Sequence, residues 1–251
     1  MTAGPAALAL EDLHLRFDQT QVIRGISLAV HAGERVGIIG PNGAGKSSLL
    51  NLISGRYAPS AGQVLLHGKR IDGQSPHAIS RLGLSRSFQV TNLFPTLSVF
   101  ENLRCSVLGS LSYRYSMWRF LTGLSAVNAR SAEVMRLVQL EARADVPAAN
   151  LSYAEQRALE IGLTVAGGAA VLLLDEPTAG MSRSETSHFT GLIRQVSVGK
   201  TLLMVEHDMG VMFDLADRIA VLVQGELLAF DTPDAVRANP RVQQAYLGGP
   251  C

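Results

Sequence analysis

The sequence predicts an α/β fold built on a buried parallel sheet, with a helical part inserted into it. Three observations support this prediction. Short apolar runs, typical of buried strands, alternate with stretches of helical periodicity along the 251 residues. One such run, Glu34–Gly40, leads into a glycine-rich loop that is followed by helical spacing. A long helical stretch from about Phe94 to Ala166 then interrupts the alternation, which indicates a subdomain inserted in one α/β unit.

The individual elements follow in order from the N-terminus. Apolar residues nearly alternate over residues 8–17 and a second run covers 26–30, so we expect the first forty residues to form strands. The run 34–40 stops at glycine, as a buried strand does, and the helical spacing after it stops at Gly55. Strands that alternate with helices imply a parallel sheet buried on both faces. The later strands are expected at 62–68, 171–174, 201–205 and 219–223.

The composition excludes several classes of protein. The 22 basic residues nearly balance the 21 acidic ones, so no strong field draws the chain to nucleic acid. Hydrophobic residues make up 47% of the chain and the mean hydropathy is +0.19, yet no apolar run is long enough to span a bilayer. The two cysteines, Cys105 and Cys251, are too few for a disulfide framework or a zinc site. Since the N-terminus also lacks the basic segment of a signal peptide, we expect a reducing, cytoplasmic setting.

The glycine-rich loop matches the pattern G-x-x-x-x-G-K-[ST] between a strand and a helix. Its glycines allow several backbone N–H groups to face one anion, and the helix directs its positive end at the same point. Lys46 adds a mobile charge for the phosphates, and the Ser47 hydroxyl can ligate Mg²⁺. The alternative is a glycine-rich turn with an exposed lysine, but the chain has only three lysines, which argues against a chance match. The residues expected to contact a nucleotide are Gly40, Pro41, Asn42, Gly43, Ala44, Gly45, Lys46, Ser47 and Ser48.

Two carboxylates, Asp175 and Glu176, follow the apolar run 171–174. Ligands of a parallel sheet gather at the carboxyl ends of its strands, where the phosphate loop also lies. We expect Asp175 to hold Mg²⁺ through water and Glu176 to polarise the attacking water. Taken alone, the pair is equally well explained as a solvated strand end, and it is the phosphate loop that favours the catalytic interpretation.

Ser152 precedes another stretch of helical periodicity and forms an S-x-x-E capping box with Glu155. A helix terminus with exposed N–H groups is also a site for an anion. From the residues alone, however, a well-formed helix start is the favoured interpretation.

These motifs together resemble the ATP-binding subunits of ATP-binding cassette (ABC) transporters, over almost the whole chain. Gly40–Ser47 matches the Walker A motif of that family, 171–176 its Walker B motif and 151–157 its signature motif. All matched motifs occur in the family order. The remaining matches are the Q-loop glutamine Gln89, the D-loop region 178–181, the switch histidine His207 and the adenine-stacking position Phe17. Without the resemblance, His207 is more often a structural histidine and Phe17 more often a core residue, while Gln89 carries no meaning.

The resemblance implies a fold and a division of the chain. A single ABC ATPase domain is expected over about 6–250. Its phosphate-loop sheet and an N-terminal antiparallel β subdomain occupy about 6–88 and 167–250, and its helical subdomain about 89–166.

The resemblance also implies a mechanism with ATP and Mg²⁺. Glu176, His207 and Gln89 are the expected catalytic residues, and Ser47, Gln89 and Asp175 the expected metal-binding ones. Two such subunits, identical or different, sandwich two ATP molecules. Ser152 and Ala154 of one subunit then face the γ-phosphate held by Lys46 of the other. Because the family normally has glycine where Ala154 stands, we expect hydrolysis with weaker closure of the sandwich.

Several segments narrow the resemblance to importers of branched-chain amino acids and related polar solutes. This group implies transmembrane permease subunits, a periplasmic or extracellular solute-binding protein, and a peripheral position on the cytoplasmic side of a bacterial or archaeal membrane. No nucleic-acid partner is expected. The segments are Arg86–Gln89, Leu93–Pro95, 97–103, 205–209 and 243–248.

Alternative functions remain open at this point. They are an ABC ATPase for another solute such as urea or amides, for lipid export, or for a role outside transport, and a non-catalytic nucleotide binder. One phosphate loop in 251 residues argues against the repair and translation relatives. The segment between Arg104 and Arg130 has four arginines, no acid and several aromatic residues. We hypothesise that Tyr113–Phe120 lies near the membrane or permease, although an ordinary family loop and helix is the favoured interpretation.

Overall fold

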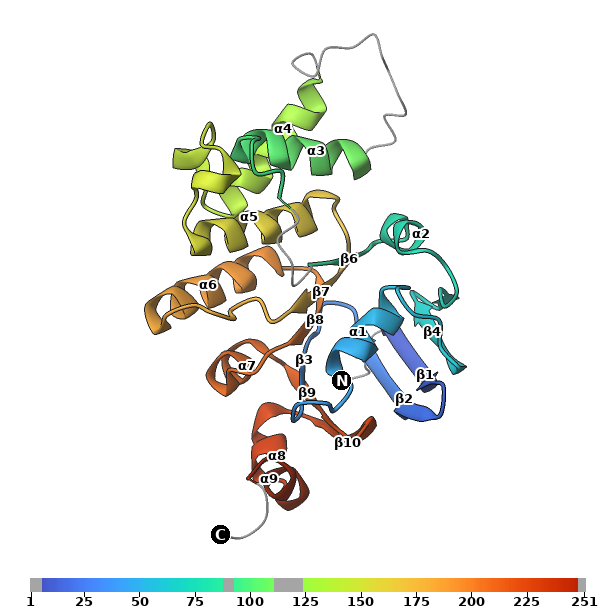
Figure 1. Ribbon diagram of the computed structural model, residues 1–251. Helices are drawn as coiled ribbons and strands as arrows, with labels where there is room; N and C mark the ends of the chain where they lie inside the picture. Colours follow the sequence, from blue (N-terminus) through green and yellow to red (C-terminus); the bar gives the residue numbers. More distant parts are fainter. Residues whose placement is uncertain (1–5, 88–92, 111–123, 248–251) are drawn as a thin grey trace. The chain divides into compact units, whose positions relative to one another are not determined.

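The computed structural model describes residues 6–87, 93–110 and 124–247 (Figure 1). They form two compact units, which we call the sheet unit and the helical unit. The sheet unit consists of 6–86, 170–179 and 199–247, and the helical unit of the described residues in 87–169 together with 180–198.

An antiparallel sheet forms the N-terminal part of the sheet unit. Its strands lie in the order β2-β1-β4-β5. The sequence analysis placed the second strand at 26–30, but it begins six residues earlier, because a two-residue turn with Asp18 at φ 50° joins it to the first strand. Pairing with β1 thus extends this strand into a polar stretch that shows no hydrophobic alternation. The strands are β1 (Ala6–Phe17), β2 (Thr20–His31), β4 (Ala61–Leu66) and β5 (Lys69–Arg70).

The second sheet of this unit has six strands in the order β10-β9-β3-β8-β7-β6. Its first five strands in chain order are parallel, and β10 pairs antiparallel with β9. Every residue of β7 and β8 is buried, which explains their unbroken apolar sequences. The short β6 and the half-buried β10 were not predicted, since neither has a distinctive pattern. The strands are β3 (Arg35–Ile39), β6 (Leu84–Arg86), β7 (Val171–Asp175), β8 (Thr201–Val205), β9 (Arg218–Val223) and β10 (Glu226–Asp231).

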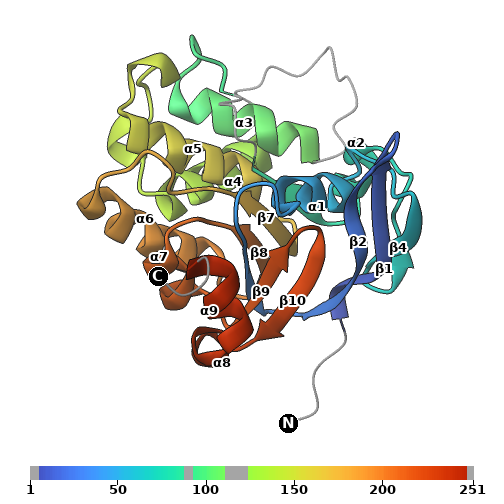
Figure 2. The same cartoon turned by 60° about the horizontal axis from the view of Figure 1, so that its bottom comes forward.

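Helix α1 packs between the two sheets (Figure 2). Leu49, Leu50 and Ile53 are fully buried in a cluster that contains residues of both sheets. This burial holds the start of α1, and with it the phosphate loop, against the carboxyl end of β3. The helices of the sheet unit are α1 (Lys46–Ile53), α2 (Pro76–Arg81), α7 (Met209–Leu215), α8 (Pro233–Ala238) and α9 (Pro240–Leu247).

The helical unit is built on α3, α4 and α5, which pack against one another. Gly162 on α5 allows the close approach, because a Cβ there would lie 3.1 Å from Leu103 and 3.4 Å from Val138. Among the described residues, none of the helices combines the length and apolar character needed to cross a membrane. The elements are α3 (Val99–Ser110), α4 (Ser125–Leu137), η2 (Glu141–Arg143), η3 (Ala148–Asn150), α5 (Tyr153–Ala166) and α6 (Arg183–Val196).

Candidate functional site

The glycine-rich loop connects β3 to α1, as predicted, and close packing requires two of its glycines, Gly40 and Gly45. Gly45 caps α1 with φ +98°, a left-handed conformation that favours glycine. A Cβ at Gly45 would also lie 2.8 Å from the Ile23 side chain. At Gly40 a Cβ would collide with the backbone carbonyl of Leu222. The glycines at these two positions therefore meet a packing requirement of the loop, in addition to the backbone freedom that phosphate binding needs.

The turn between β9 and β10 holds the loop from one side. Gln224 and Gly225 both have positive φ, the conformation of a tight hairpin turn. The Gly225 N–H donates to the Ala44 carbonyl at 3.1 Å, and the Gly225 carbonyl accepts from the Arg24 N–H at 2.9 Å. Backbone hydrogen bonds thus tie the loop to both sheets of its unit.

Lys46, the first residue of α1, is buried and points back over the loop. Its ammonium donates to the carbonyl oxygens of Gly40 at 2.7 Å and Pro41 at 3.0 Å. Burial lowers the pKa of Lys46, whereas the charges of Glu176 and Asp175 oppose that shift. The first turn of α1 contains no acidic residue, and no side chain caps it. Its N–H groups and Lys46 therefore present positive charge to whatever occupies the loop.

The two carboxylates at the end of β7 have different surroundings. The Asp175 side chain is 1% exposed and accepts a hydrogen bond from Arg86. Glu176 adopts φ +48°, a conformation that costs a non-glycine residue roughly 1–3 kcal/mol. Its backbone N–H donates to the Val205 carbonyl at 2.9 Å, which fixes this residue to the end of β8. The left-handed backbone at Glu176 directs the two side chains to different partners, Asp175 to Arg86 and Glu176 to His207.

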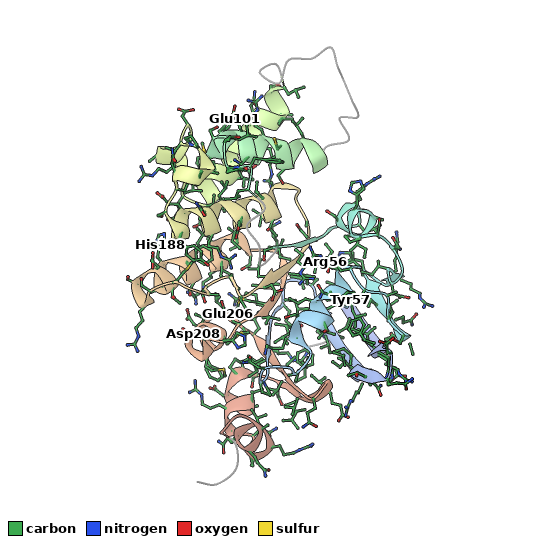
Figure 3. All side chains as sticks on the ribbon, in the orientation of Figure 1. Arg56, Tyr57, Glu101, His188, Glu206 and Asp208 are labelled. Atoms are coloured by element: carbon green, nitrogen blue, oxygen red, sulfur yellow. The ribbon has the colours of Figure 1, made fainter. Side chains whose placement is uncertain are left out.

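His207 and Glu176 meet in the sheet unit, and a buried acid anchors the segment that carries the histidine. The distance from His207 Nε2 to Glu176 Oε1 is 2.9 Å. Glu206, only 3% exposed, accepts hydrogen bonds from the Thr178 N–H, the Thr178 hydroxyl and the His207 N–H. It follows β8 directly, close to Asp208 (Figure 3). Sequence reasoning missed this role of Glu206, although an acid directly after a buried strand is a detectable signal.

A cavity of about 270 Å³ collects most of the predicted residues of the sheet unit. It is lined by Val22, the loop residues 42–48, Glu176 and His207. Phe17 is 45% exposed at the end of β1, so it is not a core residue. Its ring makes an edge contact with Tyr57 at 5.3 Å between centroids. Gln89 and the segment Tyr113–Phe120 lie outside the described residues.

The other predicted residues, Ser152 and Ala154, lie at the start of α5 in the helical unit. The Ser152 hydroxyl accepts from the Glu155 N–H at 3.3 Å, and the Glu155 carboxylate accepts from the Ser152 N–H at 2.8 Å. The capping box is thus present. Arg143 donates to the same carboxylate at 2.7 Å. These hydrogen bonds, first that from Arg143 and then that from the Ser152 backbone, lower the pKa of Glu155.

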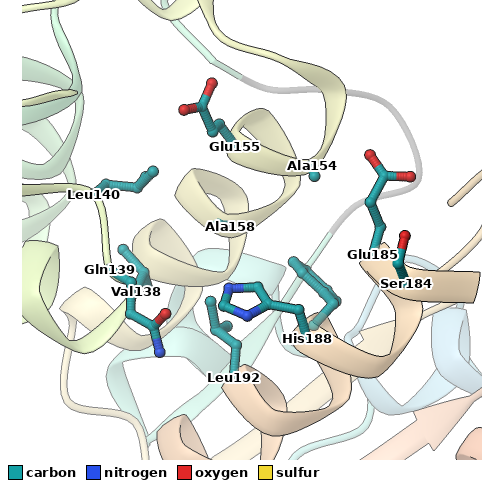
Figure 4. A pocket seen from close by; sticks show the side chains of 11 residues that line it. Val138, Gln139, Leu140, Ala154, Glu155, Ala158, Ser184, Glu185, His188 and Leu192 are labelled. Carbon is teal, nitrogen blue, oxygen red and sulfur yellow. The ribbon is translucent and has the colours of Figure 1, made fainter. Parts of the chain in front are cut away.

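A second cavity, of about 310 Å³, lies within the helical unit between α5 and α6. Its walls are mostly apolar and include Ala158, Phe189 and Leu192. Figure 4 shows the His188 imidazole between the two helices and Ala154 at the start of α5. The signature alanine therefore borders a hollow that belongs to its own unit.

The residues of the sheet unit suit Mg²⁺ as a partner of a bound phosphate chain. Ser47 and Asp175 offer hydroxyl and carboxylate oxygens, the ligand atoms that Mg²⁺ prefers. The described residues contain no group of three or more His, Cys, Asp or Glu side chains that could hold a metal ion by themselves. This fits Mg²⁺, which is usually bound by one or two protein groups together with substrate phosphates.

A phosphate loop between a buried parallel strand and a helix, with paired carboxylates at the end of another strand of that sheet, defines a P-loop ATPase. A family model described as "ABC transporter" matches residues 23–179. A second, described as "Branched-chain amino acid ATP-binding cassette transporter", matches residues 226–250. The chain belongs to the ABC transporter family, whose ATP-binding members hydrolyse ATP to power transport.

Named relatives and solved structures agree with this assignment. The chain is 35% identical to the high-affinity branched-chain amino acid transport ATP-binding protein LivG of Escherichia coli K12, over 96% of this chain and 97% of LivG. It is 30% identical to a probable branched-chain amino acid transport ATP-binding protein LivG of Archaeoglobus fulgidus, over 96% of this chain and 95% of that protein. A structure of cbiO1 from Clostridium perfringens, part of an ABC transporter complex, has a TM-score of 0.81 and 26% identity, over 97% of this chain and 96% of that one. A second solved structure, the ADP conformation of another ABC transporter cassette, has a TM-score of 0.85 and 22% identity. The match covers 97% of this chain and 99% of that one. The predicted fold class is thereby confirmed.

Proposed function

We propose that this protein is the ATP-hydrolysing subunit of an importer for branched-chain amino acids or closely related polar solutes. The observation that carries the proposal is the match of residues 226–250 to the branched-chain amino acid transporter model. That segment lies outside the match to the general ABC family model. Near-full-length similarity to the LivG proteins also supports a branched-chain amino acid importer.

The proposed nucleotide contacts come from the phosphate loop. Backbone N–H groups within Gly40–Ser48, Pro41 excepted, hold the phosphates of ATP, and Lys46 exchanges its two carbonyl partners for phosphate oxygens. Because burial already lowers the pKa of Lys46, its ammonium gains from meeting an anion there. Phe17, exposed beside Tyr57, stacks on the adenine.

The proposed chemistry uses the groups at the ends of β7 and β8. Ser47, Asp175 and Gln89 hold Mg²⁺, which when bound neutralises charge on the phosphates. Glu176 accepts a hydrogen bond from water and orients it toward the γ-phosphate. When ATP is bound, the Nε2–H group of His207 exchanges the Glu176 carboxylate, 2.9 Å away, for a γ-phosphate oxygen. Glu206 keeps the histidine in place through the backbone N–H of His207.

The proposed assembly follows from the same family relationship. We take residues 6–250 as one ATPase domain that pairs with a second ABC ATPase subunit, of the same or another kind. Ser152 and Ala154 of each subunit face the nucleotide of the other, and loss of the γ-phosphate loosens the pair. Permease subunits bind the pair at the cytoplasmic face of a bacterial or archaeal membrane, and a solute-binding protein delivers the solute from outside.

Reconstitution tests this proposal. The protein is co-purified with its membrane partners, placed in liposomes with the associated binding protein, and assayed for ATP-dependent uptake of labelled leucine, isoleucine and valine. We expect uptake of at least one of them, and none with Glu176→Gln. Uptake of urea alone, or movement of phospholipid alone, would contradict the solute assignment but keep the ATPase assignment. Wild-type protein without ATP hydrolysis in the complex would contradict both.

A further inference from the structure

A buried arginine links the Walker B strand to the helix that follows the phosphate loop. Arg86 ends β6, the edge strand beside β7. Its guanidinium donates to Asp175 Oδ2 at 2.9 Å, to Asn51 Oδ1 at 2.7 Å and to Ser54 Oγ at 2.8 Å. The side chains of Arg86 and Asp175 are 7% and 1% exposed, so solvent does not compete for these contacts.

Each partner of this guanidinium belongs to an element with a proposed role in ATP hydrolysis. Asp175 is the last residue of β7. Asn51 lies one turn after Ser47 on α1, and Ser54 caps the end of that helix. The Ser54 hydroxyl donates to the Leu50 carbonyl at 2.7 Å, so its lone pairs face Arg86 from a fixed position. One planar group therefore sets the Asp175 carboxylate relative to the helix that carries Lys46.

Stability alone does not account for this arrangement. A buried ion pair is weak evidence for stability, since its desolvation penalty can exceed the attraction between the charges. The forked guanidinium does, however, fix direction, because its donors lie in one plane at set angles. Partners that hold metal-associated groups in this way typically change metal affinity or activity by about 10–100-fold when removed.

A second Arg–Asp pair in the sheet unit provides a natural comparison. Arg35 starts β3, at the end opposite the phosphate loop, and its guanidinium donates to Asp217 at 2.9 and 3.3 Å. The two side chains are 29% and 43% exposed. This pair has the same chemistry but lies at the end of β3 opposite the proposed site.

We propose that Arg86 is a positioning residue for ATP hydrolysis, which acts by orienting Asp175 against α1. The inference rests on the proposed function, because it takes the role of Asp175 at Mg²⁺ from there.

A double-mutant cycle tests this role in the full-length chain. Arg86→Met, Asp175→Asn and the double variant are compared in kcat and KM for ATP, and in the ratio of ATP dissociation constants measured with EDTA and with Mg²⁺. We expect Arg86→Met to lower kcat and this ratio by about tenfold or more. The double variant should match Asp175→Asn within about twofold, because Arg86 acts through Asp175. Arg86→Lys, which keeps the charge, should recover part of both values.

The controls separate positioning from folding. Arg35→Met should lower the melting temperature but leave kcat and the Mg²⁺ effect on ATP binding unchanged. If Arg86→Met does not fold, the double variant, which buries no unpaired charge, is compared with Asp175→Asn directly. The assignment would be overturned if the kcat loss of the double variant equalled the product of the losses of the two single variants. Wild-type kcat and wild-type Mg²⁺ dependence of ATP binding in folded Arg86→Met would also overturn it. Should the wild-type chain bind ATP without hydrolysing it, the proposed function fails, and the Mg²⁺-dependent part of binding still decides the role of Arg86.

Discussion

Two helix starts in this protein, those of α1 and α5, match the sequence pattern of an anion site but differ in structure. The start of α1 has a left-handed glycine as its cap, no side-chain cap and no acid in the first turn. The start of α5 has Ser152 as its cap and the Glu155 carboxylate in its first turn, which in turn contacts Arg143. No side chain caps the N–H groups at the start of α1, whereas at α5 the Ser152 hydroxyl already accepts from the Glu155 N–H.

In the proposed assembly, this difference distinguishes a phosphate site formed within one chain from a contact supplied by a second subunit. At α1, an incoming phosphate meets Lys46 and unoccupied N–H groups. At α5, a phosphate must approach a helix start that already has the Glu155 carboxylate beside it. We therefore expect the phosphate contact at α5 to be weaker than that at α1. In the proposed assembly, the phosphate at α5 belongs to the nucleotide of the second subunit. The predictions below test or refine this contrast, from the largest expected effect to the smallest.

The largest effect is expected at the carboxylate that faces the α1 cavity. Glu176→Gln removes the general base but keeps the side-chain shape, so we expect ATP hydrolysis to fall by about 10²–10⁴-fold. Binding of ATP should be retained. Phosphate release and equilibrium nucleotide binding measure the two properties. A wild-type rate of phosphate release in this variant would contradict the catalytic role of Glu176.

A second large effect is expected for the charge at the start of α1. Lys46→Ala should weaken ATP binding by about 100-fold, because it removes a charged hydrogen-bond donor from the phosphates. Fluorescence titration with a labelled ATP analogue measures the change. Lys69→Ala, on the exposed strand β5, is the matched control and should bind like wild type. Equal affinity in Lys46→Ala and wild type would remove α1 from the nucleotide site.

Two of the capping boxes in the helical unit, those of α5 and α6, separate helix capping from phosphate contact. Ser182 caps α6 with Glu185 just as Ser152 caps α5 with Glu155. Alanine at either serine should lower stability by about 1 kcal/mol, measured by denaturant unfolding. Only Ser152→Ala should also reduce ATP hydrolysis by the assembled pair. If both variants reduced hydrolysis equally, Ser152 would be a helix cap and nothing more.

Ala154→Gly tests whether the methyl group keeps the second subunit away from the nucleotide. We expect ATP-dependent dimerisation and hydrolysis to rise a few-fold, while the helix loses up to about 1 kcal/mol of stability. Size-exclusion chromatography of a Glu176→Gln background with ATP follows dimerisation. Unchanged dimerisation and hydrolysis would show that the methyl group has no effect.

The smallest effect concerns the acid that satisfies the start of α5. Since Arg143 and the Ser152 N–H hold the pKa of Glu155 below its ordinary value, the ionised carboxylate stabilises the fold above the unfolded pKa. That contribution is lost as the pH falls through the lower, folded pKa. Glu155→Gln should therefore melt earlier than wild type near neutral pH, and the gap should shrink below about pH 4. A gap independent of pH would contradict the role of the carboxylate charge.

Parts of the fold were predictable because their signals are local. The phosphate loop, the buried β7 and β8, and the Ser152 capping box each occupy a few adjacent residues with a distinctive pattern. The early start of β2 was not predictable, because pairing with β1 stabilises a polar stretch that shows no alternation of apolar and polar residues. The need for glycine at position 162 became understandable only through the packing of α3 against α5.

The order of residues was enough to identify the P-loop ATPase fold and to select Lys46, Asp175 and Glu176, because glycine spacing and strand-end acids are written along the chain. Folding brought in what no local pattern contains. Contacts between distant segments place His207 beside Glu176 and give the buried Glu206 carboxylate a hydrogen bond from Thr178. They also place the Arg86 guanidinium between Asp175 and α1. Buried polar groups need partners, and the identity of those partners depends on which strands the sheet makes neighbours.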